Sequence, residues 1–470
     1  MTTAPRPAPS PSRSTLRFLP VGVALLCVQL DFFSLGLALP SIASAFGSSV
    51  TDLQWVLSAY MLSLGAFSVP AGRVGDVIGR RAAVVVGLGL FAGASVLCAL
   101  SGGVGAIVAG RLIQGVGAAL ILPNAFALIT NDTDDAERPR ALGWMIGVSG
   151  LGTALGPIVG GLLASTIGWP WVFWLNIPLA AVAALGTARV RDSRNPEAGS
   201  SLRTIDWAGV ATVILGLGLL SVGIDNVPEL GWFAPLSSGL IVAGVVGLVL
   251  WVLVERRATY PLIHASLLRN RAYLALLSVG TIGNMGTNVL IVTATFTLQS
   301  VRGFDPQVSG LYFLAGSTGV AIAGPIVGKL CQRWSAIRVL GATTALTAVG
   351  LSAMLVDALP LYCVAMFAAG LAGGMTFSAA QIGVQTVVPP RMSGEATSFM
   401  LMPVVALGGL GVVIVSGVIE AIGRGEPTPT GIDAVLVGYS AVLLVTGVTL
   451  LVAEHAGLFR PKGVASPSRP

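Results

Sequence analysis

Apolar residues along the chain gather into long runs that short polar segments separate. A helix needs about 20 consecutive apolar residues to cross the hydrocarbon core of a bilayer, and fourteen runs meet this requirement. Each is expected to form a membrane-spanning helix, because a helix satisfies its backbone hydrogen bonds internally. The pattern therefore predicts an all-α integral membrane protein. The predicted spans are 18–40, 53–72, 82–100, 104–129, 141–165, 171–187, 207–226, 234–254, 272–298, 308–331, 339–356, 361–388, 396–421 and 434–452.

The composition supports this class and excludes others. Of 470 residues, 54% are hydrophobic and 10% are charged, whereas a soluble domain carries about 25% charged residues. The four cysteines and two histidines lack the spacing of a metal site or disulfide framework, so we expect no metal and no cofactor. The net charge of +6 is spread over short loops and suits lipid headgroups, without a nucleic-acid partner. A nucleotide-binding loop and the polar clusters of a membrane enzyme are both missing, which argues against ATP as energy source and against catalysis.

The distribution of basic residues orients the spans. With the N-terminus in the cytoplasm, 23 Lys and Arg residues fall on the inner side, Arg302 and Arg424 fall outside, and Arg111 lies within a span. The positive-inside rule therefore predicts that both termini are cytoplasmic.

Two charged segments, 189–206 and 255–271, bracket the seventh and eighth spans and leave six spans on either side. This arrangement predicts two six-helix bundles with a substrate cavity between them near the bilayer midplane. The expected organisation is a disordered cytoplasmic tail (1–17), an N-terminal bundle (18–190), linker loops with two extra central helices (191–271, helices at about 207–226 and 234–254), a C-terminal bundle (272–453) and a cytoplasmic tail (454–470).

Two charged residues lie deep within predicted spans. Asp31 is nine residues from the outer end of the first span and Arg111 is seven residues from that of the fourth. A charge at bilayer depth is costly unless it faces protein or water, which makes both residues functional candidates. We hypothesise that they pair and that making and breaking the pair moves a proton. The alternatives are a purely structural ion pair and, for Asp31, direct pairing with a cationic substrate.

The loop between the second and third spans places Asp76 among three arginines. Asp76 is expected at the start of the third span, where a carboxylate favours the positive end of a helix dipole. We assign a conformational gating role to Gly72, Asp76, Gly79 and Arg80. An ordinary turn that carries positive-inside charge is the alternative.

The fifth span carries a glycine face formed by Gly152, Gly156 and Gly160, with Pro157 inside it and Gly161 beside it. Without side chains, such a face lets a neighbouring helix approach closely, and proline favours a bend. The pattern predicts a helix that rocks against a partner during a conformational change. Simple helix packing is the alternative.

Polar residues in otherwise apolar spans are candidates for the cavity wall. Pairs in the ninth and twelfth spans stand four residues apart, so each pair shares a helix face. Hydrogen bonding between helices is an alternative of equal weight. The candidate cavity residues are Asp31, Phe33, Gln114, Asn284, Asn288, Gln381 and Gln385.

These motifs resemble those of the major facilitator superfamily. The sequence GRVGDVIGRR at 72–81 is similar to its G-x-L-x-D-R-x-G-R-R loop, with Val74 in place of leucine and Val77 in place of a basic residue. The glycine segment at 143–161 resembles the antiporter signature of its fifth span. The sequence RLIQGVG at 111–117 resembles the R-x-x-Q-G-x-G of its drug exporters, in which the arginine is implicated in proton transfer.

Two further runs resemble the fourteen-span drug:proton antiporter branch. The sequence LDFFSLGLALP at 30–40 is similar to D-x-T-I-V-N-V-A-L-P, and WPWVFWLNIP at 169–178 is similar to W-R-W-x-F-x-x-N-x-P. Phe33 and Gly36 replace the threonine and asparagine of the first pattern, so the pocket near Asp31 is expected to be more apolar and aromatic than usual.

The resemblance implies a major facilitator fold and a secondary transporter, not an enzyme. It implies export of hydrophobic, cationic compounds in exchange for protons, by a monomer surrounded by lipid in a bacterial inner membrane. A dedicated exporter of one natural product or of a lipid is the nearest alternative. A non-transporting membrane sensor is a second, against which the retained Asp31 and Arg111 argue.

Overall fold

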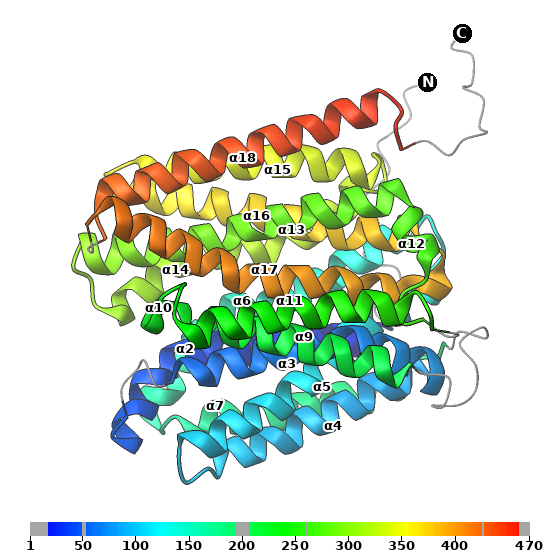
Figure 1. Ribbon diagram of the computed structural model, residues 1–470, viewed down its shortest axis with the longest axis horizontal. Helices are drawn as coiled ribbons and strands as arrows, with labels where there is room; N and C mark the ends of the chain where they lie inside the picture. Colours follow the sequence, from blue (N-terminus) through cyan, green and yellow to red (C-terminus); the bar gives the residue numbers. More distant parts are fainter. Residues whose placement is uncertain (1–16, 49–52, 194–205, 259–260, 425–426, 460–470) are drawn as a thin grey trace, which may run out of the picture.

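The computed structural model describes residues 17–48, 53–193, 206–258, 261–424 and 427–459. All the regular structure in these ranges is helical (Figure 1). Most of both predicted tails lies outside the described residues. The helices of the first half are α2 (Leu19–Phe46), α3 (Gln54–Ile78), α4 (Arg80–Ala99), α5 (Val104–Asn131), α6 (Arg138–Thr166), α7 (Pro170–Trp174) and α8 (Asn176–Thr187).

The helices of the central insert are α9 (Trp207–Asp225), α10 (Val227–Leu230), α11 (Pro235–Glu255) and α12 (Ala265–Arg269). Those of the second half are α13 (Arg271–Thr295), which continues as the π-helical turn η3 (Phe296–Val301), α14 (Pro306–Leu330), α15 (Ala336–Ser352), η4 (Ala353–Leu355), α16 (Leu359–Val387), η5 (Pro390–Met392), α17 (Ser393–Ile422) and α18 (Pro429–His455).

The predicted spans correspond closely to these helices. Among the described residues, thirteen helices are long and apolar enough to cross a membrane, with α7 and α8 together forming one of them. The remaining predicted span coincides with α17, a helix of 30 residues. The all-α membrane fold predicted from the sequence is thereby confirmed.

The first span is longer than its apolar pattern predicts. Helix α2 continues through Pro40 and ends at Phe46, since neighbouring helices can compensate for the donor that proline lacks. Asp31 is therefore fifteen residues from the end of the helix (46 − 31), or about 22 Å at 1.5 Å per residue. Asp31 is therefore further from the end of its helix than the predicted nine residues.

Each half packs mainly on itself. In the first half α2 packs on α6, and α5 packs on both α3 and α4; in the second half α16 packs on α14 and α15, and α18 packs on α15. The halves meet where α6 contacts α14 and where α3 contacts α17. In Figure 1 the second half occupies the upper part of the view and the first half the lower part.

The two extra helices lie against both halves. Helix α9 contacts α3 of the first half and α17 of the second, and α11 packs on α9. In Figure 1 this green pair runs across the front of the molecule, between α17 and α3. Only 17% of the residues in the most apolar stretch of α11 are buried, so α11 forms the outer member of the pair. Trp251 of α11 is buried and contacts Phe399 of α17, with ring centroids 6.4 Å apart.

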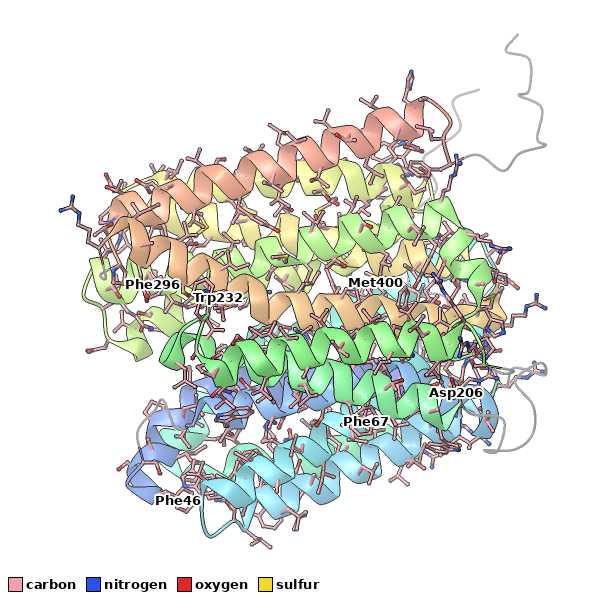
Figure 2. All side chains as sticks on the ribbon, in the orientation of Figure 1. Phe46, Phe67, Asp206, Trp232, Phe296 and Met400 are labelled. Carbon is pink, nitrogen blue, oxygen red and sulfur yellow. The ribbon has the colours of Figure 1, made fainter. Side chains whose placement is uncertain are left out.

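One end of the molecule carries Arg80, Arg138 and Arg391, and we call it the arginine-rich end. Figure 2 shows Asp206 at this end and Phe46 and Phe296 at the opposite end. Helix α2 begins and α18 ends at the arginine-rich end, as an even number of spans requires (Figure 1).

Candidate functional site

A buried ion pair joins α2 to α5 inside the first half. The carboxylate of Asp31 pairs with the guanidinium of Arg111, and both side chains are fully buried. Arg111 also donates from Nε to the carbonyl of Val56 at 3.0 Å and from a terminal nitrogen to Gln114 Oε1 at 3.0 Å. The predicted pairing is confirmed. These contacts orient both charges, while Nη2 of Arg111 has no hydrogen-bond partner among the described residues.

Other residues of this network have no counterpart in the sequence prediction. Asn176 of α8 donates from Nδ2 to Asp31 Oδ1 at 2.6 Å. Ser95 of α4 accepts a hydrogen bond of 2.8 Å from Gln114, and the ring of Tyr60 lies 4.2 Å from the guanidinium carbon of Arg111. The sequence could have indicated Asn176, which lies within the sixth predicted span, because an amide at that depth needs a polar partner.

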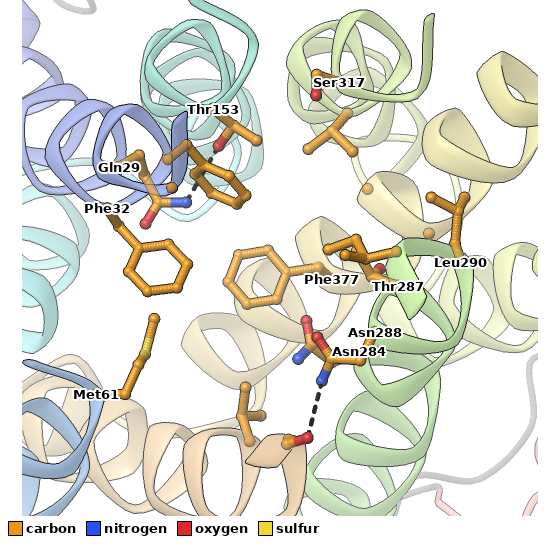
Figure 3. A pocket seen from close by; sticks show the side chains of 18 of the residues that line it. Gln29, Phe32, Met61, Thr153, Asn284, Thr287, Asn288, Leu290, Ser317 and Phe377 are labelled. Carbon is orange, nitrogen blue, oxygen red and sulfur yellow. Dashed lines mark hydrogen bonds between the residues drawn. The ribbon is translucent and has the colours of Figure 1, made fainter. Parts of the chain in front are cut away.

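A central cavity of about 650 Å³ lies between the two halves. Figure 3 shows Gln29 and Thr153 on the wall of the first half and Asn284, Asn288 and Phe377 on the wall of the second. Its volume falls within the range of pockets for drug-sized ligands. Four of the seven predicted cavity residues lie on its wall: Phe33, Asn284, Asn288 and Gln381.

The other three predicted cavity residues are not on the wall, and these predictions are corrected. Asp31 and Gln114 lie in the buried ion-pair network, where their polar atoms face α4, α5 and α8. Gln385 stands one turn of α16 further towards the arginine-rich end and accepts a hydrogen bond of 3.0 Å from Thr130. Residues four apart share a face, but the helices converge beyond Gln381, so the next turn meets protein instead of open space.

The wall of the cavity is apolar and aromatic, and its polar groups are neutral. Among the described residues that line it, none carries a formal charge. Ser221 and Ile224 of α9 belong to the wall, so the central insert contributes directly to the cavity. The aromatic members are Phe32, Phe33, Phe126, Phe313 and Phe377.

The connection between α3 and α4 joins the two halves at the arginine-rich end. It consists of Gly79, whose φ of 103° is accessible to glycine and strained for other residues. This sharp turn brings Arg80 back over the end of α3. Its guanidinium donates to Asp76 Oδ1 at 2.7 Å and to the carbonyl of Arg391, in the second half, at 2.8 Å.

The predicted position of Asp76 is wrong. Asp76 lies in the last turn of α3, where the helix dipole is negative, and not at the start of the third span. The nearby helix N-terminus belongs to α17 of the other half, since a Cβ atom on Gly394 would lie 3.7 Å from Asp76 Oδ1. Gly72, one turn earlier on α3, meets α17 so closely that an added Cβ atom would clash with the hydroxyl of Ser398.

A second set of contacts closes the same end. Gln385 bridges Thr130 of the first half and Thr397 of α17. Arg138 donates to the carbonyls of Thr130 at 3.3 Å and Gln385 at 3.5 Å. Among the described residues, the hydrogen bonds between the halves all lie at the arginine-rich end, which is therefore closed in this conformation.

The glycine face predicted in α6 packs within its own half. A Cβ atom on Gly152 would lie 2.5 Å from the carbonyl oxygen of Leu26, and one on Gly156 would lie 2.6 Å from Cβ of Phe33. A Cβ atom on Gly160 would clash with the carbonyl of Ser34. This face holds α6 against α2. Pro157 lines the cavity, and the nearest atom to a Cβ on Gly161 would be 3.5 Å away.

A different glycine face of α6, which the sequence prediction missed, crosses between the halves. A Cβ atom on Gly143 would lie 2.6 Å from the carbonyl oxygen of Gly324, and one on Gly147 would lie 2.7 Å from the ring of Pro325. A Cβ atom on Gly150 would lie 2.7 Å from Cα of Ala321. All three neighbours belong to α14. The three-to-four-residue spacing from Gly143 to Gly150 was the available signal.

The segment after α11 is attached to α17 by His264, whose Nδ1 lies 2.8 Å from Glu395 Oε2. The hydrogen bond to Glu395 raises the pKa of His264; partial burial and the charge of Arg73 oppose the rise, while the charge of Asp76 adds to it. A raised pKa in the folded state stabilises the fold fully below the ordinary value of about 6.5 and stops doing so as the pH rises through the raised value.

Replacing His264 with glutamine should therefore lower the melting temperature more at about pH 6 than at about pH 9. The measurement is thermal unfolding of the purified protein and of His264→Gln across this range. A difference in melting temperature that stayed constant or grew with pH would contradict this assignment.

Two bundles of membrane-spanning helices around a central cavity define a membrane transport protein. The sequence profile of the Major Facilitator Superfamily matches residues 21–400 and 276–469, and this chain belongs to that superfamily. Transporters of this superfamily are not enzymes. Three curated relatives give a finer comparison.

The multidrug resistance protein Stp of Mycobacterium tuberculosis is 31% identical over 82% of this chain and 72% of its own length. The puromycin resistance protein pur8 of Streptomyces alboniger is 32% identical over 92% of this chain and 88% of its own. The tetracenomycin C resistance and export protein of Streptomyces glaucescens is 34% identical over 67% of this chain and 58% of its own.

Solved structures agree on the fold. The human organic anion transporter MFSD10 (TETRAN) superposes with a TM-score of 0.66 at 17% identity, covering 94% of this chain and all of that one. The fucose:proton symporter FucP of E. coli superposes with a TM-score of 0.65 at 12% identity, covering 93% of this chain and 99% of that one. At these identities the likeness concerns the fold alone.

Proposed function

We propose that this protein exports hydrophobic small molecules from the cytoplasm in exchange for protons, by alternating access of the central cavity to the two sides of the membrane. Relatives named for multidrug, puromycin and tetracenomycin C resistance support export. The cavity between the halves supports a drug-sized substrate. The closed arginine-rich end supports alternation, because its contacts must break before the cavity can open there.

The observation that carries proton coupling is the buried ion pair of Asp31 and Arg111. A carboxylate that loses its guanidinium partner in a dry environment takes up a proton, since an unpaired charge there is costly. Rearrangement of the first half that separated the pair would bind a proton, and re-formation would release it. The pair lies behind the cavity wall, so proton and substrate would use different sites.

The arrangement in the membrane follows the same proposal. In it, residues 18–190 and 272–453 would form the two bundles, with the insert at 191–271 between them, as in a fourteen-span drug:proton antiporter. The basic residues support a cytoplasmic position for the arginine-rich end and for both termini. The bacterial relatives support a bacterial inner membrane. The protein would act as a monomer, because one chain encloses the cavity.

A dedicated exporter of one natural product is the second candidate, and the relatives named for a single antibiotic favour it. The two functions differ in breadth. A multidrug exporter lets structurally unrelated dyes compete for transport, whereas a dedicated exporter is inhibited by one chemical series.

The test uses purified full-length protein in liposomes across which a pH gradient is imposed. We expect a lipophilic dye to accumulate only when the gradient is present, and we expect the transport to stop when a protonophore collapses the gradient. Accumulation that persisted without a gradient would contradict proton exchange. If neither dyes nor natural products moved, export itself would be rejected.

A further inference from the structure

The chemistry of the cavity wall defines which substrates it can hold, and this inference rests on the proposed export function. Gln381 of α16 lies on the wall and is 1% exposed. Neither its amide nitrogen nor its amide oxygen has a hydrogen-bond partner among the described residues. A buried amide with both groups unpaired is unusual, because each group loses its contact with water and gains nothing in return.

The other glutamine on the wall behaves differently. Gln29 donates from Nε2 to the hydroxyl of Thr153 at 3.3 Å, as Figure 3 shows. Asn288 donates to the carbonyl of Gly408 at 3.4 Å. These two amides are held by the protein, whereas the amide of Gln381 is unpaired; its nitrogen and oxygen are buried at the wall and would reach a molecule in the cavity by rotation of the side chain.

Among the described side chains, the charges near the cavity are balanced without a substrate. The carboxylate of Asp31 is held by Arg111 and Asn176 and does not reach the wall. A cationic substrate would leave water without gaining a counter-ion. Phenylalanine faces attract cations, but by less than the cost of desolvating a charge without a partner.

A neutral substrate meets no such penalty. Phe32 and Phe33 pack edge to face with centroids 5.2 Å apart, and Phe377 faces the first half from across the cavity (Figure 3). Aromatic walls of this kind bury flat apolar rings. A carbonyl or hydroxyl on such a ring system can bond to the free amide of Gln381.

We infer that the cavity selects neutral aromatic molecules that carry a hydrogen-bonding carbonyl or hydroxyl, and that Gln381 is the residue that determines this selection. The cationic preference was implied by the family resemblance, and Asp31, the candidate counter-ion for such a substrate, does not lie on the wall. Export in exchange for protons is compatible with a neutral substrate, since the proton site lies behind the wall.

Nile red and Nile blue form a matched pair of probes. They share one fused ring skeleton, and Nile red carries a neutral carbonyl where Nile blue carries a cationic iminium group. Equilibrium binding of each dye is measured by fluorescence with the full-length protein in one detergent. The partition of each dye into micelles is measured without protein and subtracted, and it cancels when wild type is compared with variants at equal detergent concentration. We expect wild type to bind Nile red about tenfold more tightly than Nile blue, which corresponds to about 1.4 kcal/mol.

The variants test the role of Gln381 itself. Gln381→Leu removes both polar groups and should weaken Nile red binding about tenfold, while Gln381→Glu introduces a carboxylate and should reverse the preference in favour of Nile blue. Gln299→Leu makes the same replacement in η3, outside the cavity wall, and should change neither affinity. An unchanged preference in both Gln381 variants would overturn its assignment.

The outcomes separate this inference from the proposed function. Wild-type protein that bound Nile blue as tightly as Nile red would overturn the neutral preference, even if the Gln381 variants failed to fold. Gradient-driven transport of Nile blue in that case would leave proton-coupled export intact. Nile red that bound selectively but did not move under a pH gradient would support the inference and contradict export.

Discussion

Replacing Asp31 with asparagine is expected to abolish proton-driven export while the cavity still binds its ligand. Asparagine keeps the shape of aspartate and can still contact Asn176, but it cannot exchange a proton or balance Arg111. Removing one partner of a buried ion pair costs about 3–5 kcal/mol because the other charge is left uncompensated. This cost falls on the stability of the fold and lowers the yield of folded protein, while transport by the folded protein should stop because the group that exchanges the proton is missing.

The measurement compares gradient-driven dye uptake and equilibrium dye binding for wild type and Asp31→Asn. Asp134→Asn is the matched control, since it makes the same change at an exposed carboxylate in the loop between α5 and α6. We expect the control to transport normally. If Asp31→Asn lost binding in parallel with transport, Asp31 would contact the substrate and its position behind the cavity wall would need another explanation. Normal transport by Asp31→Asn would reject it as the proton site.

Replacing Gly143 with leucine is expected to hold the arginine-rich end open. The backbones of α6 and α14 touch here, because a Cβ atom on Gly143 would lie 2.6 Å from the carbonyl oxygen of Gly324 and 2.7 Å from Cα of Gly328. Backbone atoms cannot move aside as a flexible side chain can. Overpacking of this kind costs about 1–3 kcal/mol, and a bias of that size shifts a two-state equilibrium about 5- to 150-fold.

A cross-link between the two halves at the arginine-rich end reports the shift between the closed and open conformations. Gln332 donates to the carbonyl of Ala136 at 3.4 Å across the two halves, so a short bifunctional thiol reagent should join the pair Ala136→Cys and Gln332→Cys only when this end is closed. We expect this reagent to cross-link the otherwise wild-type chain efficiently and the Gly143→Leu chain poorly. Gly89→Leu is the control, because nothing lies within 4 Å of a Cβ atom at that exposed glycine.

A contrasting variant separates gating from folding. Gly160→Leu should reduce the yield of folded protein and should not favour the open over the closed conformation, since the clash with the carbonyl of Ser34 lies within one half. Equal cross-linking of the Gly143→Leu and Gly89→Leu chains would show that the contact of α6 with α14 does not control closure.

The glycines of α6 illustrate where sequence reasoning succeeded and where it did not. Their spacing predicted a close helix contact, and α2 provides it at Gly152, Gly156 and Gly160. The same helix uses Gly143, Gly147 and Gly150 against α14. A helix surface shows which positions are small, but not which neighbour they meet. The neighbour of each glycine face is therefore undetermined until the bundles are assembled.

The polar residues near the cavity also show what the sequence alone can and cannot predict. Asp31 and Arg111 were identified as a pair because charge within an apolar run is costly wherever the run is placed. Gln381 and Gln385 looked equivalent, one turn apart on one face. Only the first meets the cavity, because the helices converge towards the closed end and surround the second with Thr130 and Thr397.

By itself, the sequence determined the class of the protein, the position of its spans and the presence of two buried charges. These features depend on the thickness of the bilayer and on the cost of burying polar groups, which act on each helix separately. The tertiary structure decided that Asn176 joins the ion pair, that Asp76 lies at the end of α3 beside α17, and that the described residues of the cavity wall are uncharged. These features depend on which helices are neighbours, and that is settled by packing between residues far apart in the chain.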